Sequence, residues 1–103
     1  MEKTLNQKIE EEIKAKISDK SAFTCKDETI TDVSQLTLNL NEDYAQNMPE
    51  RVLFNGNARF KFEPKVENLV GNSAICHFSE YATIRDFHVV EVNKPIKIEK
   101  GIL

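Results

Sequence analysis

The sequence predicts an α+β fold in which one N-terminal helix packs on a curved, mostly antiparallel sheet of four to six strands. Two observations predict this class. Over residues 4–18, apolar residues recur at every fourth position, which is the spacing of one helical face. Over residues 22–100, apolar and polar residues instead alternate with period two, as in half-buried strands. A helix segregated from a run of strands is typical of α+β rather than α/β architecture.

Length and composition favour a single domain spanning residues 1–103. The 14 basic and 17 acidic residues give a net charge of −3, which does not favour nucleic acid or an anionic membrane as a partner. No apolar run approaches the roughly 18 residues of a membrane span. The N-terminus is charged throughout, unlike a signal peptide. The sequence therefore predicts no membrane partner and a cytoplasmic location.

The helix is expected to span about residues 4–18. Thr4 and Gln7 fit a capping box, in which each residue satisfies a backbone N–H of the other. Ser18 and Asp19 favour turns, which places the end of the helix near residues 18–21. One apolar stripe faces the sheet, and it consists of Leu5, Ile9, Ile13 and Ile17.

Strand candidates follow at 22–25, 36–40, 52–63, 73–85, 87–92 and 96–99. In 52–63 the apolar parity continues through Gly56, which favours an unbroken strand with a bulge or close backbone approach over a hairpin turn. A turn or bend is expected at Arg85 and Asp86. The nearly continuous apolar run 87–92 predicts a central strand covered on both faces. Pro95 and the polar residues beyond it predict an edge strand at 96–99.

The simplest packing curls the sheet around the helix. This order of elements resembles the outline of the cystatin-like and nuclear-transport-factor-like folds, and the resemblance rests on element order. The apolar stripe of the helix would then meet four phenylalanines of the sheet, which are Phe54, Phe60, Phe62 and Phe78.

Several kinds of chemistry are excluded or disfavoured. With three glycines, no glycine-rich phosphate loop can be written. Cys25 and Cys76 fit neither a zinc ribbon nor a redox motif and are interpreted as small buried hydrophobes. Cys76 and His77 are neighbours on one strand, so their side chains point to opposite faces and cannot form a nucleophile–base pair. The sequence predicts no catalytic residue, no metal site and no cofactor.

The first candidate site is a ligand pocket between the helix and the curved sheet. Glu80 interrupts the apolar face of 73–85, and a carboxylate facing a core must be paired, protonated or at the mouth of a cavity. At the mouth of such a cavity, the Glu80 carboxylate could act as a general base. Alternatively, the strand bends and Glu80 reaches solvent. The pocket residues would be Glu80, Phe54, Phe60, Phe62 and Phe78, with Tyr81 a further polar group.

The second candidate site is the outer face of the sheet. It presents basic and aromatic residues, which are enriched in protein interfaces. A solvated face without a partner is the simpler alternative. One tyrosine is a small stacking platform for single-stranded nucleic acid. The residues of this face are Arg59, Lys61, His77, Tyr81 and Arg85.

The sequence does not identify a biological process. The function it favours is a small non-catalytic protein-interaction or accessory module that forms a homodimer, because exposed edges of a small sheet invite symmetric pairing. One alternative is a small-molecule binding protein or enzyme that uses the pocket. Another is single-stranded nucleic-acid binding, although the acidic net charge disfavours nucleic acid as a partner.

Overall fold

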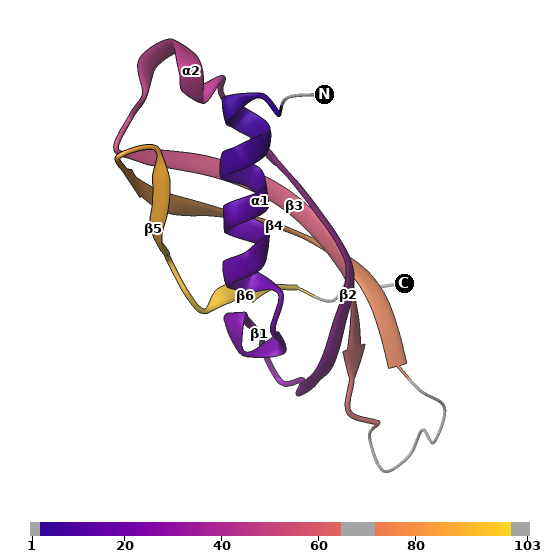
Figure 1. Cartoon of the computed structure of the whole chain (residues 1–103). Helices are drawn as coiled ribbons and strands as arrows, with labels where there is room; N and C mark the ends of the chain where they lie inside the picture. Colours follow the sequence, from indigo (N-terminus) through magenta and orange to yellow (C-terminus); the bar gives the residue numbers. More distant parts are fainter. Residues whose placement is uncertain (1–2, 65–71, 100–103) are drawn as a thin grey trace.

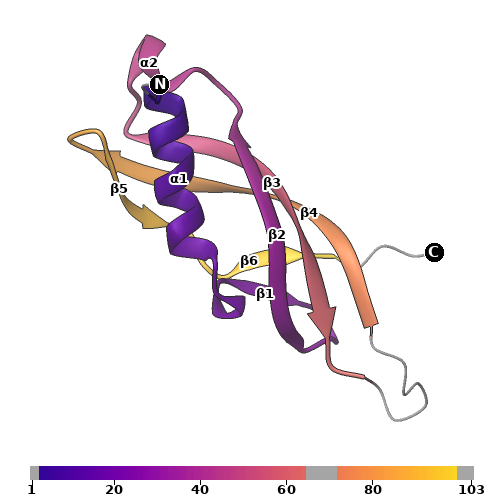
Figure 2. The ribbon, with the colours of Figure 1, turned by 45° about the vertical axis from the view of Figure 1, so that its right-hand side comes forward.

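The computed structural model describes residues 3–64 and 72–99, in which an antiparallel sheet curls around one helix (Figures 1 and 2). The helix is α1 (Leu5–Ile17). The four-stranded sheet has the order β2 (Ile30–Leu40), β3 (Arg51–Phe62), β4 (Asn72–Arg85) and β5 (His88–Val92). A two-stranded sheet pairs β1 (Phe23–Cys25) with β6 (Ile96–Ile98). Two short helical segments are η1 (Lys20–Ala22) and α2 (Tyr44–Asn47). The predicted α+β class is confirmed.

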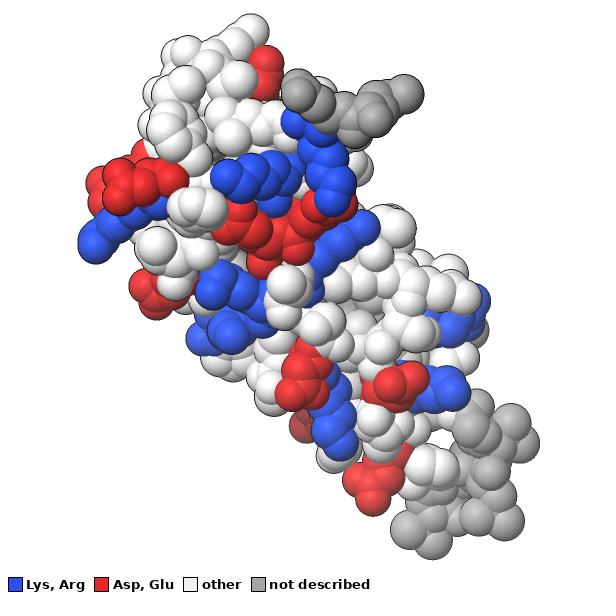
Figure 3. All heavy atoms as spheres, viewed as in Figure 1, with Lys and Arg blue, Asp and Glu red and all other residues white. Residues whose placement is uncertain are grey.

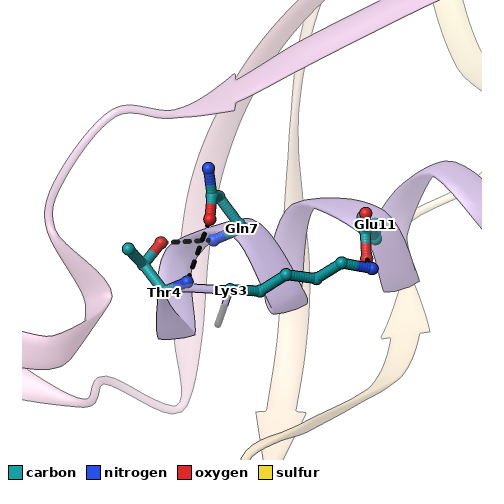
Figure 4. A network of polar contacts seen from close by, with 4 residues as sticks. All are labelled: Lys3, Thr4, Gln7 and Glu11. Carbon is teal, nitrogen blue, oxygen red and sulfur yellow. Dashed lines mark hydrogen bonds and ion pairs between the residues drawn. The ribbon is translucent and has the colours of Figure 1, made fainter. Parts of the chain in front are cut away.

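Helix α1 begins and ends where the sequence predicts. The Thr4 hydroxyl accepts a hydrogen bond from the Gln7 backbone N–H at 3.1 Å. In return, the Gln7 side-chain oxygen accepts from the Thr4 N–H at 2.9 Å, which completes the capping box (Figure 4). Ser18 is the C-cap. The predicted stripe faces the sheet, and its fully buried members are Ile9, Ile13 and Ile17.

The hydrophobic core lies between α1 and the concave face of the sheet. The aromatic ring of Phe23 packs edge-to-face against Phe60 and Phe78, with centroid distances of 5.0 and 5.1 Å. Phe54 and Phe60 are 0% exposed. The core also includes the inner side of the small β1–β6 sheet, because Phe23 of β1 and Ile96 and Ile98 of β6 are buried with these rings.

Strand β3 runs unbroken through Gly56, as the alternation predicts. Its residues pair in continuous register with β4, and Gly56 lies between Leu38 of β2 and Phe78 of β4. A Cβ atom at this position would lie 2.6 Å from the Thr37 carbonyl oxygen and 2.7 Å from the Phe78 ring. Both distances are far below van der Waals contact, so the close approach of the neighbouring strands requires a glycine here.

Helix α1 also holds the two outer strands of the sheet. Successive helical residues are about 100° apart, so Glu10 and Glu12 lie on opposite sides of the apolar stripe. The Leu40 N–H of β2 donates to the Glu10 carboxylate at 3.0 Å. The Val89 N–H of β5 donates to the Glu12 carboxylate at 2.9 Å. Backbone donors at both outer strands are thus satisfied by side chains of the helix, which is one way that proteins cover sheet edges.

The prediction of a central strand over 87–92 is wrong, because β5 is an outer strand of the sheet. Asp86 and Phe87 both have positive φ angles, 51° and 64°, and form the two-residue turn between β4 and β5. Positive φ at both central residues matches the twist of hairpin strands. Val90 is 48% exposed. The apolar run does not correspond to a covered strand, because Phe87 occupies the turn and Val90 is exposed to solvent.

Strand β6 leaves the main sheet. It follows Pro95, as expected of an edge strand, but it pairs in parallel with β1, with Phe23 opposite Ile96. In Figures 1 and 2 the β1–β6 pair crosses the larger sheet at an angle, near the C-terminal end of α1. Most of the loop predicted over 64–72 lies outside the described residues. Within the described ranges, no helix is long and apolar enough to cross a membrane.

Candidate interaction surface at the open edge of β4

Strand β4 is paired along nearly its whole length on one side and only near its end on the other. Strand β3 pairs with it from Asn72 to Thr83. On the far side, β5 pairs only with residues 82–85 of β4. The last backbone bond there runs from the Asn93 N–H to the Tyr81 carbonyl at 3.1 Å. Within residues 3–64 and 72–99, no strand pairs with the far side of residues 72–79, which we call the open edge.

The geometry of a strand identifies the backbone groups that face the open edge. In an antiparallel ladder, the N–H and C=O of one residue point to the same side, and those of the next residue to the opposite side. The Tyr81 carbonyl points toward β5, whereas the Ile84 N–H points toward the β3 side, where it donates to Glu50 at 2.7 Å. Odd-numbered residues therefore point outward, and along the open edge they are Ser73, Ile75, His77 and Ser79.

Glu80 marks the boundary between the paired and open parts of β4. Its carboxylate oxygen accepts hydrogen bonds from the Tyr81 N–H at 2.9 Å and from the Asn93 side-chain amide at 3.0 Å. The Tyr81 N–H points outward at the place where pairing with β5 stops. The carboxylate therefore substitutes for the carbonyl of a missing strand, which gives this half-buried residue a structural role.

The sequence of the open edge contains none of the residue types that discourage edge pairing. Residues 72–79 read NSAICHFS and contain no Lys, Arg, Asp, Glu, Pro or Gly. Natural sheets commonly guard exposed edges with charged side chains, prolines or bulges. The register of β4 with β3 is also continuous along this stretch, so the edge is regular. Such an edge can accept a further strand.

The outer edge of β2 is less suited to accepting a strand, because β2 contains a charged residue, Asp32, and has an irregular register. Its pairing with β3 is interrupted between Ile30 and Asp32 and again between Ser34 and Thr37. Gln35, within the second interruption, has a positive φ of 53°. Bulges bend and twist an edge away from a regular ladder and so hinder strand addition. The contrast makes the open edge of β4 the candidate surface.

A groove of about 730 Å³ runs beside the open edge. One wall is β4, where Ile75 is 56% exposed. The other wall includes Lys97 of β6 and Glu99 directly after it. Strand β6 crosses near β4 without pairing to it, as Figure 2 shows. The backbone of the open edge is therefore flanked by space and by two opposite charges.

The structure places the predicted outer-face residues on one side of the sheet but not in one patch. Lys61 lies opposite Ser73, and Arg85 lies at the other end of β4. That separation along the strand is about 40 Å at the usual rise per residue. His77 lies on the open edge, opposite Asn57. Tyr81 lies at its end.

Three of these residues have partners within the chain. The guanidinium of Arg51 lies 4.6 Å from the centroid of the Tyr81 ring. Arg59 donates to the Ser73 hydroxyl at 3.5 Å, and Arg85 lies 3.9 Å from the Glu50 carboxylate.

The predicted pocket residues are placed mainly in the core. Phe54, Phe60, Phe62 and Phe78 are all buried, and Phe78 also reaches the groove beside β4. Glu80 is held by the contacts described above. Among the described residues, no group of three or more His, Cys, Asp or Glu lies close enough to hold a metal ion.

The alternation places Ile75 and Ser79 on the outer face with His77, but sequence reasoning did not identify the backbone edge that they share as a candidate site. The signal was present, because the alternating segment 72–79 lacks charge. Recognising its importance required the length of β5, which pairs only with residues 82–85 of β4. Comparison of this chain with protein-family models, curated proteins and solved structures finds no match.

Proposed function

We propose that this protein is a small non-catalytic interaction module that binds a polypeptide by strand addition at the open edge of β4. The observation that carries the proposal is the regular, uncharged edge of residues 72–79 with four outward-facing residues. An extended segment laid along it would exchange main-chain hydrogen bonds with Ser73, Ile75, His77 and Ser79. Main-chain bonds supply affinity in this mode, and alternate side chains supply specificity.

The two alternative functions have less specific support. The phenylalanines that would line a ligand pocket are packed against α1 and one another. The Tyr81 ring that would stack on a nucleobase already contacts Arg51. On the face that carries α1, basic and acidic side chains are interspersed rather than gathered by sign (Figure 3). A cytoplasmic protein partner is therefore the proposal that we develop.

Backbone hydrogen exchange tests the proposal. The probe is an eight-residue peptide of alternating Val and Thr, added to the ¹⁵N-labelled protein at low protein concentration. We expect slower exchange at the outward amides of Ser73, Ile75, His77 and Ser79, because each gains a carbonyl partner. Amides of Ala74 and Phe78 face β3 and should not change.

Two matched variants sharpen this test. Ile75→Lys places a charge on the open edge and should abolish the protection. Val90→Lys changes a similarly exposed apolar residue on β5 and should leave it intact. The proposal is overturned if the four amides exchange at the same rate with and without peptide at all protein concentrations, or if the peptide protects β2 instead.

A further inference from the structure

We infer that the polypeptide bound at the open edge is a second copy of this chain, joined by antiparallel pairing of β4 with the partner's β4 about a two-fold axis. The inference rests on the proposed function and names its partner. An antiparallel pair of identical strands has a two-fold axis perpendicular to the sheet, so the α1 helices of both copies would lie on the same face of one continuous sheet.

The backbone groups of β4 determine the register of this pairing. The Tyr81 N–H donates to Glu80 and its carbonyl accepts from Asn93, so Tyr81 is not available to a new strand. The outward residues that remain are Ser73, Ile75, His77 and Ser79. Only one register pairs each of these four residues with another of the four on the second copy. In that register Ser73 lies opposite the partner's Ser79, and Ile75 lies opposite the partner's His77.

The neighbouring register is less favourable. If the axis passed through His77, Ser73 would lie opposite the partner's Tyr81, whose backbone groups are already bonded within its own chain. One hydrogen-bonded pair would then be lost at each end of the ladder. The axis is therefore expected at position 76, where the two strands form a non-hydrogen-bonded pair.

Side chains and charges along the edge are self-complementary. Residues 72–79 contain no Lys, Arg, Asp or Glu, so no like charges of these residues oppose one another in the pair. The exposed side chain of Ile75 would pack against the imidazole ring of the partner's His77. The groove wall carries one cation, Lys97, and one anion, Glu99. A two-fold axis gives both copies the same pair of opposite charges beside the ladder, so this wall adds no net charge to the interface.

This pairing closes at two copies. Each copy contributes one regular open edge and uses it against the same edge of its partner, which is a closed, isologous contact. Each copy then keeps two outer edges. One is β2, with its interrupted register and its Leu40 N–H already bound to Glu10. The other is the short β5, whose Val89 N–H is already bound to Glu12. Further strand addition is therefore hindered, and the expected assembly is a dimer rather than a fibre.

Engineered disulfides test both the partner and the register. In a Cys25→Ala/Cys76→Ala background, Ile75→Cys/His77→Cys places thiols at directly opposed positions, within the reach of a disulfide. We expect this variant to form a covalent dimer under mild oxidation. The matched variant Ile75→Cys/Ser79→Cys carries equally many thiols at positions that are not opposed, and it should cross-link poorly. Efficient cross-linking of the matched variant instead would overturn the register.

Native mass spectrometry and sedimentation test the dimer itself. The wild-type chain and Val90→Lys should be dimers, and Ile75→Lys should dissociate at least about tenfold more readily while keeping its circular dichroism spectrum, a change of about 1.4 kcal/mol. A dimer unaffected by Ile75→Lys would use another surface and would overturn the inference. A chain that stays monomeric up to about 100 µM would overturn it as well. If that monomer still gains peptide protection at the four amides, the proposed function stands without self-pairing.

Discussion

Gly56 shows how close packing of strands restricts a single position. Because a Cβ atom there would meet both the Thr37 carbonyl and the Phe78 ring, we expect Gly56→Ala to lower the free energy of unfolding by about 1–3 kcal/mol through overpacking. Urea denaturation measures the loss. Lys61→Ala on the same strand is the control and should change stability by less than about 0.5 kcal/mol, because its side chain is exposed. Equal midpoints for the two variants would contradict this account.

Glu80 can be separated into its hydrogen-bonding and charge contributions. Glu80→Gln keeps an oxygen that can accept from the Tyr81 N–H and from Asn93, whereas Glu80→Ala removes it. We expect Glu80→Ala to cost about 1 kcal/mol and to speed exchange of the Tyr81 amide, with a smaller effect for Glu80→Gln. If Glu80→Gln instead behaved like Glu80→Ala, the negative charge would be the important property, and the pocket hypothesis for Glu80 would regain support.

Residue-level prediction from sequence succeeded where a local pattern determines the outcome. The parity of apolar residues through Gly56 predicted an unbroken strand with either a bulge or a close backbone approach, and the structure has an unbroken strand with the close approach. The role of Glu80 could not be predicted, because its partner Asn93 is 13 residues away and the bond depends on where pairing with β5 ends. A carboxylate on an apolar face indicates that some partner exists without identifying it.

At the scale of the element, α1 depends on its N-terminal cap. Thr4→Ala removes the acceptor for the Gln7 N–H, and we expect a loss of about 1 kcal/mol in thermal or urea unfolding. Thr4→Ser keeps the hydroxyl and should retain most of the stability that Thr4→Ala loses. Lys3→Ala is a second control, because the ion pair of Lys3 with Glu11 is largely exposed and such pairs contribute little (Figure 4). A larger loss for Lys3→Ala than for Thr4→Ala would contradict the capping explanation.

Elements with a complete local signal were predicted well, and those defined by their neighbours were not. The helix had a cap, a stripe and a turn-rich end within 18 residues, so its bounds followed from the sequence. The position of β5 in the sheet did not, because periodicity describes which faces are buried and not which strand lies alongside. The parallel pairing of β1 with β6 was likewise absent from any local pattern.

For the whole molecule, the strength of self-association should depend little on salt. The proposed interface is a backbone ladder along uncharged residues, with Lys97 and Glu99 only at its rim. Raising NaCl from about 50 to about 500 mM screens exposed charges strongly, yet we expect the dimer dissociation constant to change by less than about threefold. Sedimentation at the two salt concentrations measures it. Association that weakened steeply with salt would indicate an electrostatic surface and contradict the ladder.

The candidate site could be identified only from the assembled sheet. The sequence predicted an outer face with Arg59, Lys61, His77, Tyr81 and Arg85, and the structure spreads them along the length of β4 and its neighbour. The open edge exists because β4 extends well beyond β5, and relative strand lengths are a property of the assembled sheet. The fold class could be predicted from sequence, whereas the surface depends on which strands end first.

The contacts that Glu12 and β1 make have a consequence for how the chain acquires its fold during synthesis. Glu12 binds the Val89 N–H across 77 positions, and Phe23 pairs with Ile96. Helix α1 can therefore dock on β2 through Glu10 and Leu40, but its contact with β5 and the pairing of β1 with β6 form only after those strands have been synthesised. Contacts this distant in sequence slow folding, because loop closure precedes any stabilising contact. Until β5 and β6 emerge, α1 is held over the apolar face of β2 and β3 from one side only, and this is the interval in which a nascent chain would need protection from other chains.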